Sequence, residues 1–174
     1  MTVSRMKGKW AQGIQPRNFA WIIKDRLAIC ERPGGYGANH RRVRRQEEII
    51  WLREQGFGCV ISLRPSTHNL HNYDEFEVPY LHRPYGPGDD ARTVLHSLYP
   101  EIHEQLTAGS KVVLHADEVG DRVAGVVGGY VRWAGMVPEG PQAISIIETI
   151  TGRQLDPMGR GLIALAAELD NRPS

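Results

Sequence analysis

The chain has only two cysteines and no long hydrophobic run. Cys30 and Cys59 belong to no CxxC or Cys/His spacing, so the sequence indicates neither a disulfide framework nor a structural zinc site. No segment approaches the roughly eighteen consecutive apolar residues of a membrane span, and the basic N-terminus lacks the continuous apolar core of a signal peptide. We therefore expect a cytoplasmic protein without a membrane partner.

A surplus of charge of either sign is also absent. The 174 residues include 21 Lys and Arg against 20 Asp and Glu, which leaves a net charge of +1. Such a balance produces no global field that would attract nucleic acid, so we do not expect a nucleic-acid partner. With 41% hydrophobic residues, the chain is long enough for one well-packed domain. We predict an irregular basic arm over residues 1–18 and a single domain over residues 19–174.

Strand-like and helix-like patterns alternate along this domain. β-branched runs predict strands, apolar residues spaced by three or four predict helices, and Gly and Pro mark the breaks. In chain order we predict a hairpin over 20–35, a helix over 44–55, a strand over 59–66, an exposed polar segment over 68–77, a strand over 78–85, a helix over 91–108 kinked or divided at Pro100, a strand over 111–114, a buried helix over 123–137, and two short amphipathic helices over 138–152 and 156–169. This order predicts an α/β fold of three layers, in which helices flank a central, mostly parallel sheet.

The segment HADEVGDR, His115 to Arg122, follows the predicted strand and leads into the predicted buried helix. Because ligands of parallel α/β sheets bind at the carboxyl ends of strands, this segment is the candidate site. It resembles the signature loop of the cysteine-dependent protein tyrosine and dual-specificity phosphatases, which reads His-Cys, five residues, then Arg. The run VISLRPS, residues 60–66, also resembles a strand of the compact members, so the resemblance covers residues 20–169.

The resemblance implies a phosphatase-like fold and a role for each residue of the loop. It places Ala116 at the position of the nucleophilic Cys and Asp121 at that of an Asp common before the family's Arg. Asp89 or Asp90 stands where the general acid would lie, although Asp90 also suits the N-cap of the next helix. The residues that it assigns to a phosphate or other ligand are His115, Asp117, Glu118, Val119, Gly120, Arg122 and, at the helix N-terminus, Val123.

Several residues depart from the family pattern. Ala116 has no atom that can attack phosphorus, so the family's reaction cannot run on this chain. Val123 stands where Ser or Thr is usual, and Ala124 where a Gly is expected. Val119 stands at another expected Gly, and its β-branched side chain tolerates positive φ poorly, which predicts a different loop shape or a register shifted onto Gly120. These joint changes favour natural loss of the nucleophile over one substitution in an otherwise intact enzyme.

Acidic side chains surround the same loop. Asp117, Glu118 and Asp121 bring negative charge to a site that the family uses for an anion. We expect some of these side chains to point away, and we expect Asp121 to pair with Arg122. Alternatively, the loop acids and an upstream Asp could hold a divalent cation, although their spacing matches no established metal motif.

Three functions remain open on the sequence. The first is a catalytically inactive pseudophosphatase that binds a protein partner, a phosphorylated protein or a small phospho-ligand. The second is an active phosphatase, a phosphomonoester hydrolase, that carries an inactivating Cys→Ala substitution at Ala116. The third is an enzyme that uses the acidic loop for new chemistry, with or without a metal. We expect no cofactor, no resident metal and no phosphatase turnover from the chain as it stands.

Overall fold

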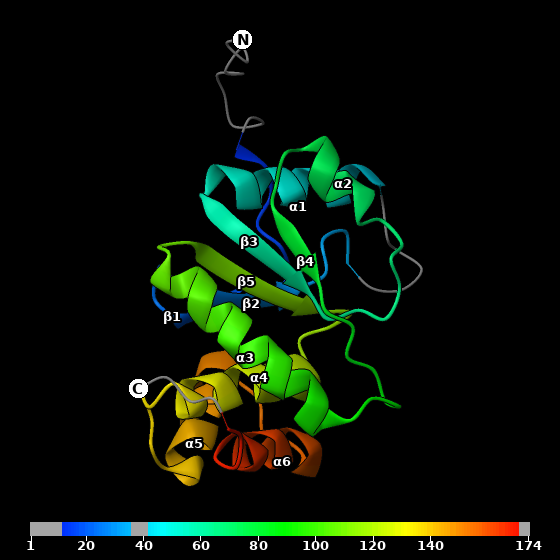
Figure 1. Cartoon of the computed structure of the whole chain (residues 1–174). Helices are drawn as coiled ribbons and strands as arrows, with labels where there is room; N and C mark the ends of the chain where they lie inside the picture. Colours follow the sequence, from blue (N-terminus) through cyan, green and yellow to red (C-terminus); the bar gives the residue numbers. More distant parts are fainter. Residues whose placement is uncertain (1–11, 36–41, 171–174) are drawn as a thin grey trace.

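The computed structural model describes residues 12–35 and 42–170, which are built around one five-stranded sheet (Figure 1). The strands are β1 (Ala20–Ile23), β2 (Leu27–Glu31), β3 (Phe57–Ser62), β4 (Tyr80–His82) and β5 (Lys111–Ala116), in the spatial order β1-β2-β5-β3-β4. β1 is antiparallel to β2, and the other neighbouring strands are parallel. β5 is therefore the central strand, and its carboxyl end lies in the middle of one edge of the sheet.

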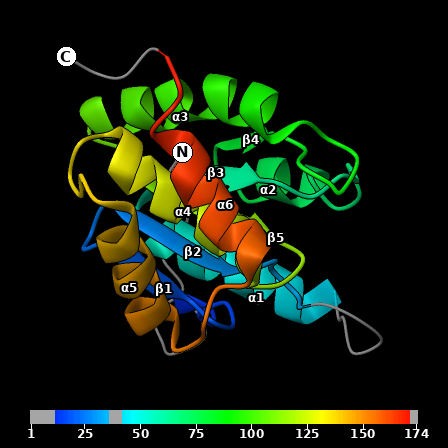
Figure 2. The same cartoon turned by 90° about the horizontal axis from the view of Figure 1, so that it is seen from below.

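Helices cover both faces of the sheet. α1 (Arg42–Glu54) and α2 (His71–Glu75) lie on one face, and α3 (Ala91–Thr107), α4 (Asp121–Trp133), α5 (Gly140–Thr151) and α6 (Pro157–Ala166) lie on the other (Figure 1 and Figure 2). Alternate strand residues supply the two cores, because successive side chains point to opposite faces. In β5, Val112 and Leu114 pack in the core toward α4, whereas Val113 packs in the core toward α1. The predicted three-layer α/β fold is thus confirmed.

The helix that follows the candidate loop, α4, is the most buried helix of the fold. Its glycines permit close packing, as the Gly-Gly pair in its sequence predicts. A Cβ on Gly125 would lie 3.0 Å from the Cα atom of Gly159 in α6, and a Cβ on Gly129 would lie 2.2 Å from the hydroxyl oxygen of Tyr99 in α3. The Tyr99 hydroxyl donates a 2.8 Å hydrogen bond to the carbonyl oxygen of Val126. These contacts fix the direction of α4 and hence the place of its N-terminus.

The structure corrects three predictions about individual elements. α3 is a single helix through Pro100, so the predicted division does not occur, because buried residues on both sides of the proline hold the helix against the core. The segment 68–77, predicted to be exposed, contains α2, in which Asn72 and Tyr73 are buried. β3 and β4 end earlier than predicted, at Ser62 and His82, although backbone hydrogen bonds from Leu63 to His115 and from Tyr85 to Leu63 still join the neighbouring segments beyond the strand ends.

Only part of the predicted basic arm can be placed, because residues 1–11 lie outside the described residues. Residues 13 and 14 lie against α1, and residues 17 and 18 form hydrogen bonds with Glu31 of β2. The amide of Ile14 donates a 3.1 Å hydrogen bond to the carbonyl oxygen of Glu47. Gly13 has φ +74 and approaches α1 so closely that a Cβ there would lie 2.2 Å from the same oxygen. This part of the arm is therefore packed on the domain.

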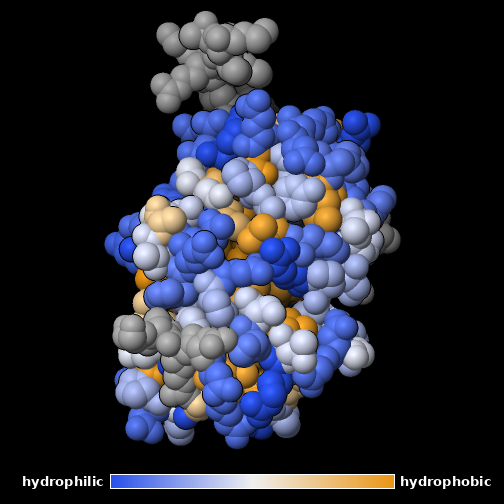
Figure 3. Space-filling model, viewed as in Figure 1, coloured by the Kyte–Doolittle hydropathy of each residue, from blue (hydrophilic) through white to orange (hydrophobic). Residues whose placement is uncertain are grey.

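The molecular surface on the side shown in Figure 1 is mostly hydrophilic, and apolar side chains are visible there only in limited areas (Figure 3). Among residues 12–35 and 42–170, no helix combines the length and the apolar character needed to cross a membrane.

Candidate functional site: the pocket between β5 and α4

The candidate loop connects the central strand to the central helix. β5 ends at Ala116, and α4 begins at Asp121 with Gly120 as its N-cap. No residue from 116 to 122 has a positive φ, and Gly120 itself has φ −119. Val119 therefore occupies an ordinary backbone region. The loop takes a shape without a left-handed residue, and the alternative of a left-handed position shifted onto Gly120 does not occur.

The first turn of α4 is open to a ligand. Gly120 provides no side-chain cap, and the intrahelical bonds begin with the 3.1 Å bond from the Ala124 amide to the Gly120 carbonyl. The amides of Asp121, Arg122 and Val123 precede this bond and have no acceptor within the helix. Such amides, together with the helix dipole, favour an anion at a helix N-terminus.

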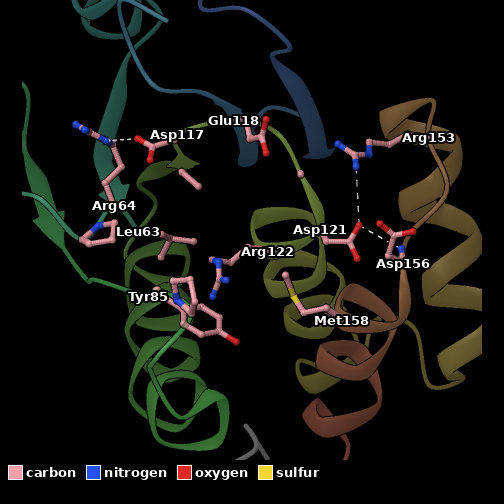
Figure 4. A pocket seen from close by; sticks show the side chains of 15 residues that line it. Leu63, Arg64, Tyr85, Asp117, Glu118, Asp121, Arg122, Arg153, Asp156 and Met158 are labelled. Carbon is pink, nitrogen blue, oxygen red and sulfur yellow. Dashed lines mark hydrogen bonds and ion pairs between the residues drawn. The ribbon is translucent and has the colours of Figure 1, made fainter. Parts of the chain in front are cut away.

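A pocket of about 410 Å³ lies at this end of α4 (Figure 4). Its volume falls in the range of about 300–1,000 Å³ that is usual for small-molecule sites. Its lining residues are Leu63, Arg64, Pro65, Tyr85, Gly86, Pro87, Ala116, Asp117, Glu118, Gly120, Asp121, Arg122, Arg153, Asp156 and Met158. The methyl group of Ala116 is thus part of the pocket wall, at the position that the resemblance assigns to the nucleophile.

Arg122 points into the pocket between Tyr85 and Met158 (Figure 4). Its guanidinium carbon lies 4.6 Å from the centroid of the Tyr85 ring, which is the geometry of a cation–π contact. Burial raises the pKa of Tyr85, so its hydroxyl stays neutral and the ring remains a partner for the cation. Within the described part of the chain, Arg122 forms no ion pair with a carboxylate. Its positive charge is therefore held in position and available to an anion.

Asp121 does not pair with Arg122, which corrects the prediction from sequence. Its carboxylate accepts hydrogen bonds from the backbone amides of Gly159, at 2.8 Å, and Asp156, at 3.2 Å. It also lies 4.0 Å from the Nη2 atom of Arg153. Gly159 lies in the first turn of α6 and Asp156 is the N-cap residue before it, so the Asp121 side chain, which belongs to α4, caps the N-terminus of α6. Gly159 lies more than thirty residues after Asp121, so the local sequence could not reveal that the two residues form a hydrogen bond.

The other loop acids are also directed away from Arg122. The carboxylate of Asp117 accepts a hydrogen bond from Nε of Arg64 and lies 3.6 Å from Nη1 of Arg32. Glu118 is exposed to solvent. The expectation that some loop acids point away is met. Their negative charges therefore repel an anion bound at Arg122 less strongly than the number of acids suggests.

His115 is buried and holds the loop through hydrogen bonds. Its Nε2 atom lies 2.9 Å from the hydroxyl of Tyr73, and its Nδ1 atom lies 3.4 Å from the carbonyl oxygen of Ala116. Burial lowers the pKa of His115 to about 4, with the charges of Arg64 and Arg32 acting in the same direction. The ring is consequently neutral near pH 7. It acts as a structural link between α2 and the strand end.

The two candidates for a general acid are both engaged elsewhere. Asp89 accepts a 2.6 Å hydrogen bond from the amide of Gly86. Asp90 is the N-cap of α3 and accepts bonds from the amide and the hydroxyl of Thr93, at 3.0 and 2.6 Å. These bonds lower the pKa of Asp90, which disfavours the protonated form that a general acid needs. Neither side chain lines the pocket.

A metal site has no support in the part of the chain that the structure describes. No group of three or more His, Cys, Asp or Glu side chains is placed there to hold a metal ion. Asp117 is occupied by arginines and Asp121 by backbone amides, so the two acids do not converge on one point. The acidic loop thus lacks the converging oxygen ligands that a divalent cation requires.

Nine of the fifteen residues that line the pocket were not assigned from the sequence, and three of them, Arg64, Arg153 and Tyr85, bear on its charge and shape. Arg64 lies two residues after the end of β3, the neighbour of β5, and the rule that ligands lie at strand ends could have pointed to it. Arg153 donates a 2.7 Å hydrogen bond to the carbonyl oxygen of Val119 and so ties the loop to the segment after α5. Tyr85 supplies the ring beneath Arg122. For the last two, no local pattern gave a signal.

Several solved structures with the same fold are described as phosphatases or phosphatase-like proteins. Kinase associated phosphatase (KAP), with its catalytic cysteine substituted by serine, superimposes with a TM-score of 0.75 at 16% identity, covering 91% of this chain and 99% of KAP. Tk-PTP in its active form gives a TM-score of 0.69 at 16% identity, covering 90% of this chain and 98% of that one. Human tyrosine phosphatase-like serine/threonine/tyrosine-interacting protein gives 0.60 at 15% identity, with coverage of 86% and 93%.

No protein-family model and no curated protein sequence matches the chain. The structural likeness nevertheless defines the class: the chain has the fold of the protein tyrosine and dual-specificity phosphatases, as the resemblance of its loop predicts. At 12–18% identity the likeness concerns the fold. What the pocket does has to be argued from its own residues.

Proposed function

We propose that this protein is a phosphatase-fold binding protein, a pseudophosphatase, that holds a phosphate monoester of a partner molecule in the pocket without hydrolysing it. The observation that carries the proposal is that Ala116 and Arg122 both line the same pocket. The anion-binding arginine is present and unpaired by carboxylates of the described residues, while the position of the nucleophile holds a methyl group.

The absence of turnover follows from two missing groups. Covalent phosphoryl transfer needs a nucleophile at the end of β5, and Ala116 provides none. Protonation of the leaving oxygen needs a carboxylic acid that faces the ligand, whereas Asp89 and Asp90 are not lining residues of the pocket and their carboxylates accept backbone hydrogen bonds. Even a water attack would therefore proceed without acid catalysis from these two residues.

Binding of a phosphate monoester is supported by the donors that remain. Arg122 can donate two N–H groups to two oxygens of a phosphate, and the amides of the first turn of α4 can donate hydrogen bonds to the same anion. Arg153 and Arg64 add positive charge to the wall, each partly offset by its own carboxylate partner. Apolar surface from Leu63 and Met158 suits the organic part of an ester better than free phosphate.

The test is a binding titration with two probes that differ in source, a phosphotyrosine peptide and phenyl phosphate. Arg122→Ala should weaken binding of both by about ten- to a hundredfold, because charge-assisted hydrogen bonds contribute roughly 1.5–3 kcal/mol. Arg92→Ala is the matched control, since Arg92 is an exposed arginine paired with Glu168 on the surface. Tighter binding of the peptide would identify a phosphorylated protein as the partner, and equal binding would indicate a small phospho-ligand. Equal affinities of the unaltered chain and Arg122→Ala would refute the proposal.

A cytoplasmic location is part of the same proposal.

A further inference from the structure

A second pocket lies at the opposite edge of the sheet from Arg122. The pocket described above is at the carboxyl end of β5, whereas this one borders the turn before β2 and the end of α3, beside the amino end of β5 (Figure 1). Its volume is about 410 Å³, which also falls in the range usual for small-molecule sites. The proposed function does not use this pocket.

One side of the second pocket is apolar. Ile23 at the end of β1, Leu106 in α3 and Met136 after α4 form this apolar side. Met136 is 56% exposed, so its side chain stands at the rim of the pocket. Because methionine is flexible and polarizable, such a rim adapts to the shape of an apolar ligand.

The other side of the second pocket is polar and includes Arg26, His103 and Tyr130. Nη2 of Arg26 donates a hydrogen bond to the carbonyl oxygen of Leu106, which fixes the guanidinium at the end of α3. The Tyr130 hydroxyl lies 3.5 Å from Nδ1 of His103. Burial raises the pKa of Tyr130 to about 12, with the charge of Arg26 acting in the opposite direction. The hydroxyl therefore keeps its proton near pH 7 and can donate it to a ligand.

The charge of Arg26 has no counter-ion in the part of the chain that the structure describes. Arg26 forms no ion pair with a carboxylate there, and no acidic residue lines the pocket. The last carbonyl oxygens of α3 are already engaged, since the amides of Gly109 and Ser110 donate to those of Leu106 and Gln105. The pocket therefore offers a positive charge and hydrogen-bond donors, but few free acceptors.

We infer that this pocket binds a small apolar carboxylic acid in its ionised form. The planar guanidinium of Arg26 matches the two oxygens of a carboxylate, and the Tyr130 hydroxyl adds a further donor. The apolar side covers the hydrocarbon or aromatic body of such a ligand. A single arginine suits one negative charge better than the double charge of a phosphate ester. An amine would meet the charge of Arg26 and no carboxylate of the lining residues.

The first test is a binding titration with naphthoate, its neutral counterpart naphthamide, and acetate. Naphthoate should bind at least about tenfold more tightly than either, because naphthamide lacks the charge and acetate lacks the apolar body. Arg26→Met should weaken naphthoate binding by about ten- to a hundredfold and naphthamide binding by less than about twofold. Lys24→Met is the matched control, since it removes an exposed charge from the same turn and should leave naphthoate binding unchanged. Equal binding of naphthoate and naphthamide, or full affinity in Arg26→Met, would overturn the inference.

The second test uses the unaltered protein, because Arg26 also holds the end of α3 and its replacement affects that helix. Crystals soaked with bromonaphthoate should show anomalous scattering of bromine in this pocket, with the carboxylate within hydrogen-bond distance of Arg26. Bromine found only elsewhere, including the pocket at Arg122, would show the assignment to be wrong. Arg122→Ala should keep its naphthoate affinity while it loses phenyl phosphate, because Arg122 does not line the second pocket. Failure of this inference is thereby distinguishable from failure of the proposed function.

Discussion

Replacement of Asp121 tests whether this loop residue is structural. Asp121→Ala removes the acceptor of two backbone amides at the N-terminus of α6, those of Gly159 and Asp156, and the Asp121 side chain is only 10% exposed. Loss of a cap costs about 0.5–2 kcal/mol, and loss of a negative charge at a helix N-terminus costs about 0.3–1 kcal/mol more. The pair with Arg153 is long and half-exposed, so it adds little. The free energy of unfolding should fall by about 1–3 kcal/mol.

Thermal unfolding followed by circular dichroism measures this change. For a domain of this size, the expected loss corresponds to an unfolding temperature lower by about 2–12 °C. Asp156→Asn is the control, because Asp156 is the N-cap of α6 by position but makes no side-chain cap bond. It should cost about 0.5 kcal/mol or less. Binding of phenyl phosphate should be unchanged or tighter in Asp121→Ala. Equal destabilisation by both variants, or loss of ester binding in Asp121→Ala, would refute the capping role.

Three further predictions follow from the same geometry. The pKa of His115 is about 4 in the folded chain and about 6.5 for an unfolded histidine, so the unfolded chain binds a proton first as the pH falls. The free energy of unfolding should therefore decrease between about pH 6.5 and pH 4, by up to about 3 kcal/mol. Urea unfolding of His115→Asn should depend less on pH than that of the unaltered chain, and parallel pH profiles would exclude His115 as the cause. Gly129→Ala should lower the free energy of unfolding by about 1–3 kcal/mol, since the added Cβ would lie 2.2 Å from the Tyr99 hydroxyl. In Gly161→Ala the added Cβ meets no atom within 4 Å, so this variant should stabilise α6 by about 0.5–1 kcal/mol. The opposite order of stabilities in urea unfolding would show that the packing around Gly129 is not the cause. Ala116→Cys should not release phosphate from an aryl phosphate above the rate in buffer, because the chain also lacks an available general acid; clear turnover would instead identify an active enzyme disabled at one position.

Much of the fold could be predicted because its signals are local. Apolar periodicity marks α3 and α4, and the hairpin of β1 and β2 is bounded by polar turn residues and Gly. The crossover after His115 was predicted for the same reason, since an apolar strand, a polar loop and an apolar helix follow one another directly. α2 was missed because five residues are too few for a periodic signal and its buried face is one tyrosine and one asparagine.

The candidate site was harder to predict because its contacts join distant segments. Six of the predicted loop residues line the pocket, whereas His115, Val119 and Val123 are not among its lining residues. The partner of Asp121 lies at α6, and that of Asp117 follows β3. Which carboxylate neutralises which arginine depends on how helices and strands pack, and spacing along the chain carries no information about it.

The central claim is that the pocket retains a phosphate ester and leaves it intact. Equilibrium dialysis of the unaltered chain against phenyl phosphate, with free phosphate and phenol quantified in the same chambers, measures retention and cleavage together. We predict that the ester accumulates on the protein side and is recovered whole, with phosphate release no faster than in buffer. Cleavage of the ester by the unaltered chain, or its even distribution across the membrane, would contradict the account.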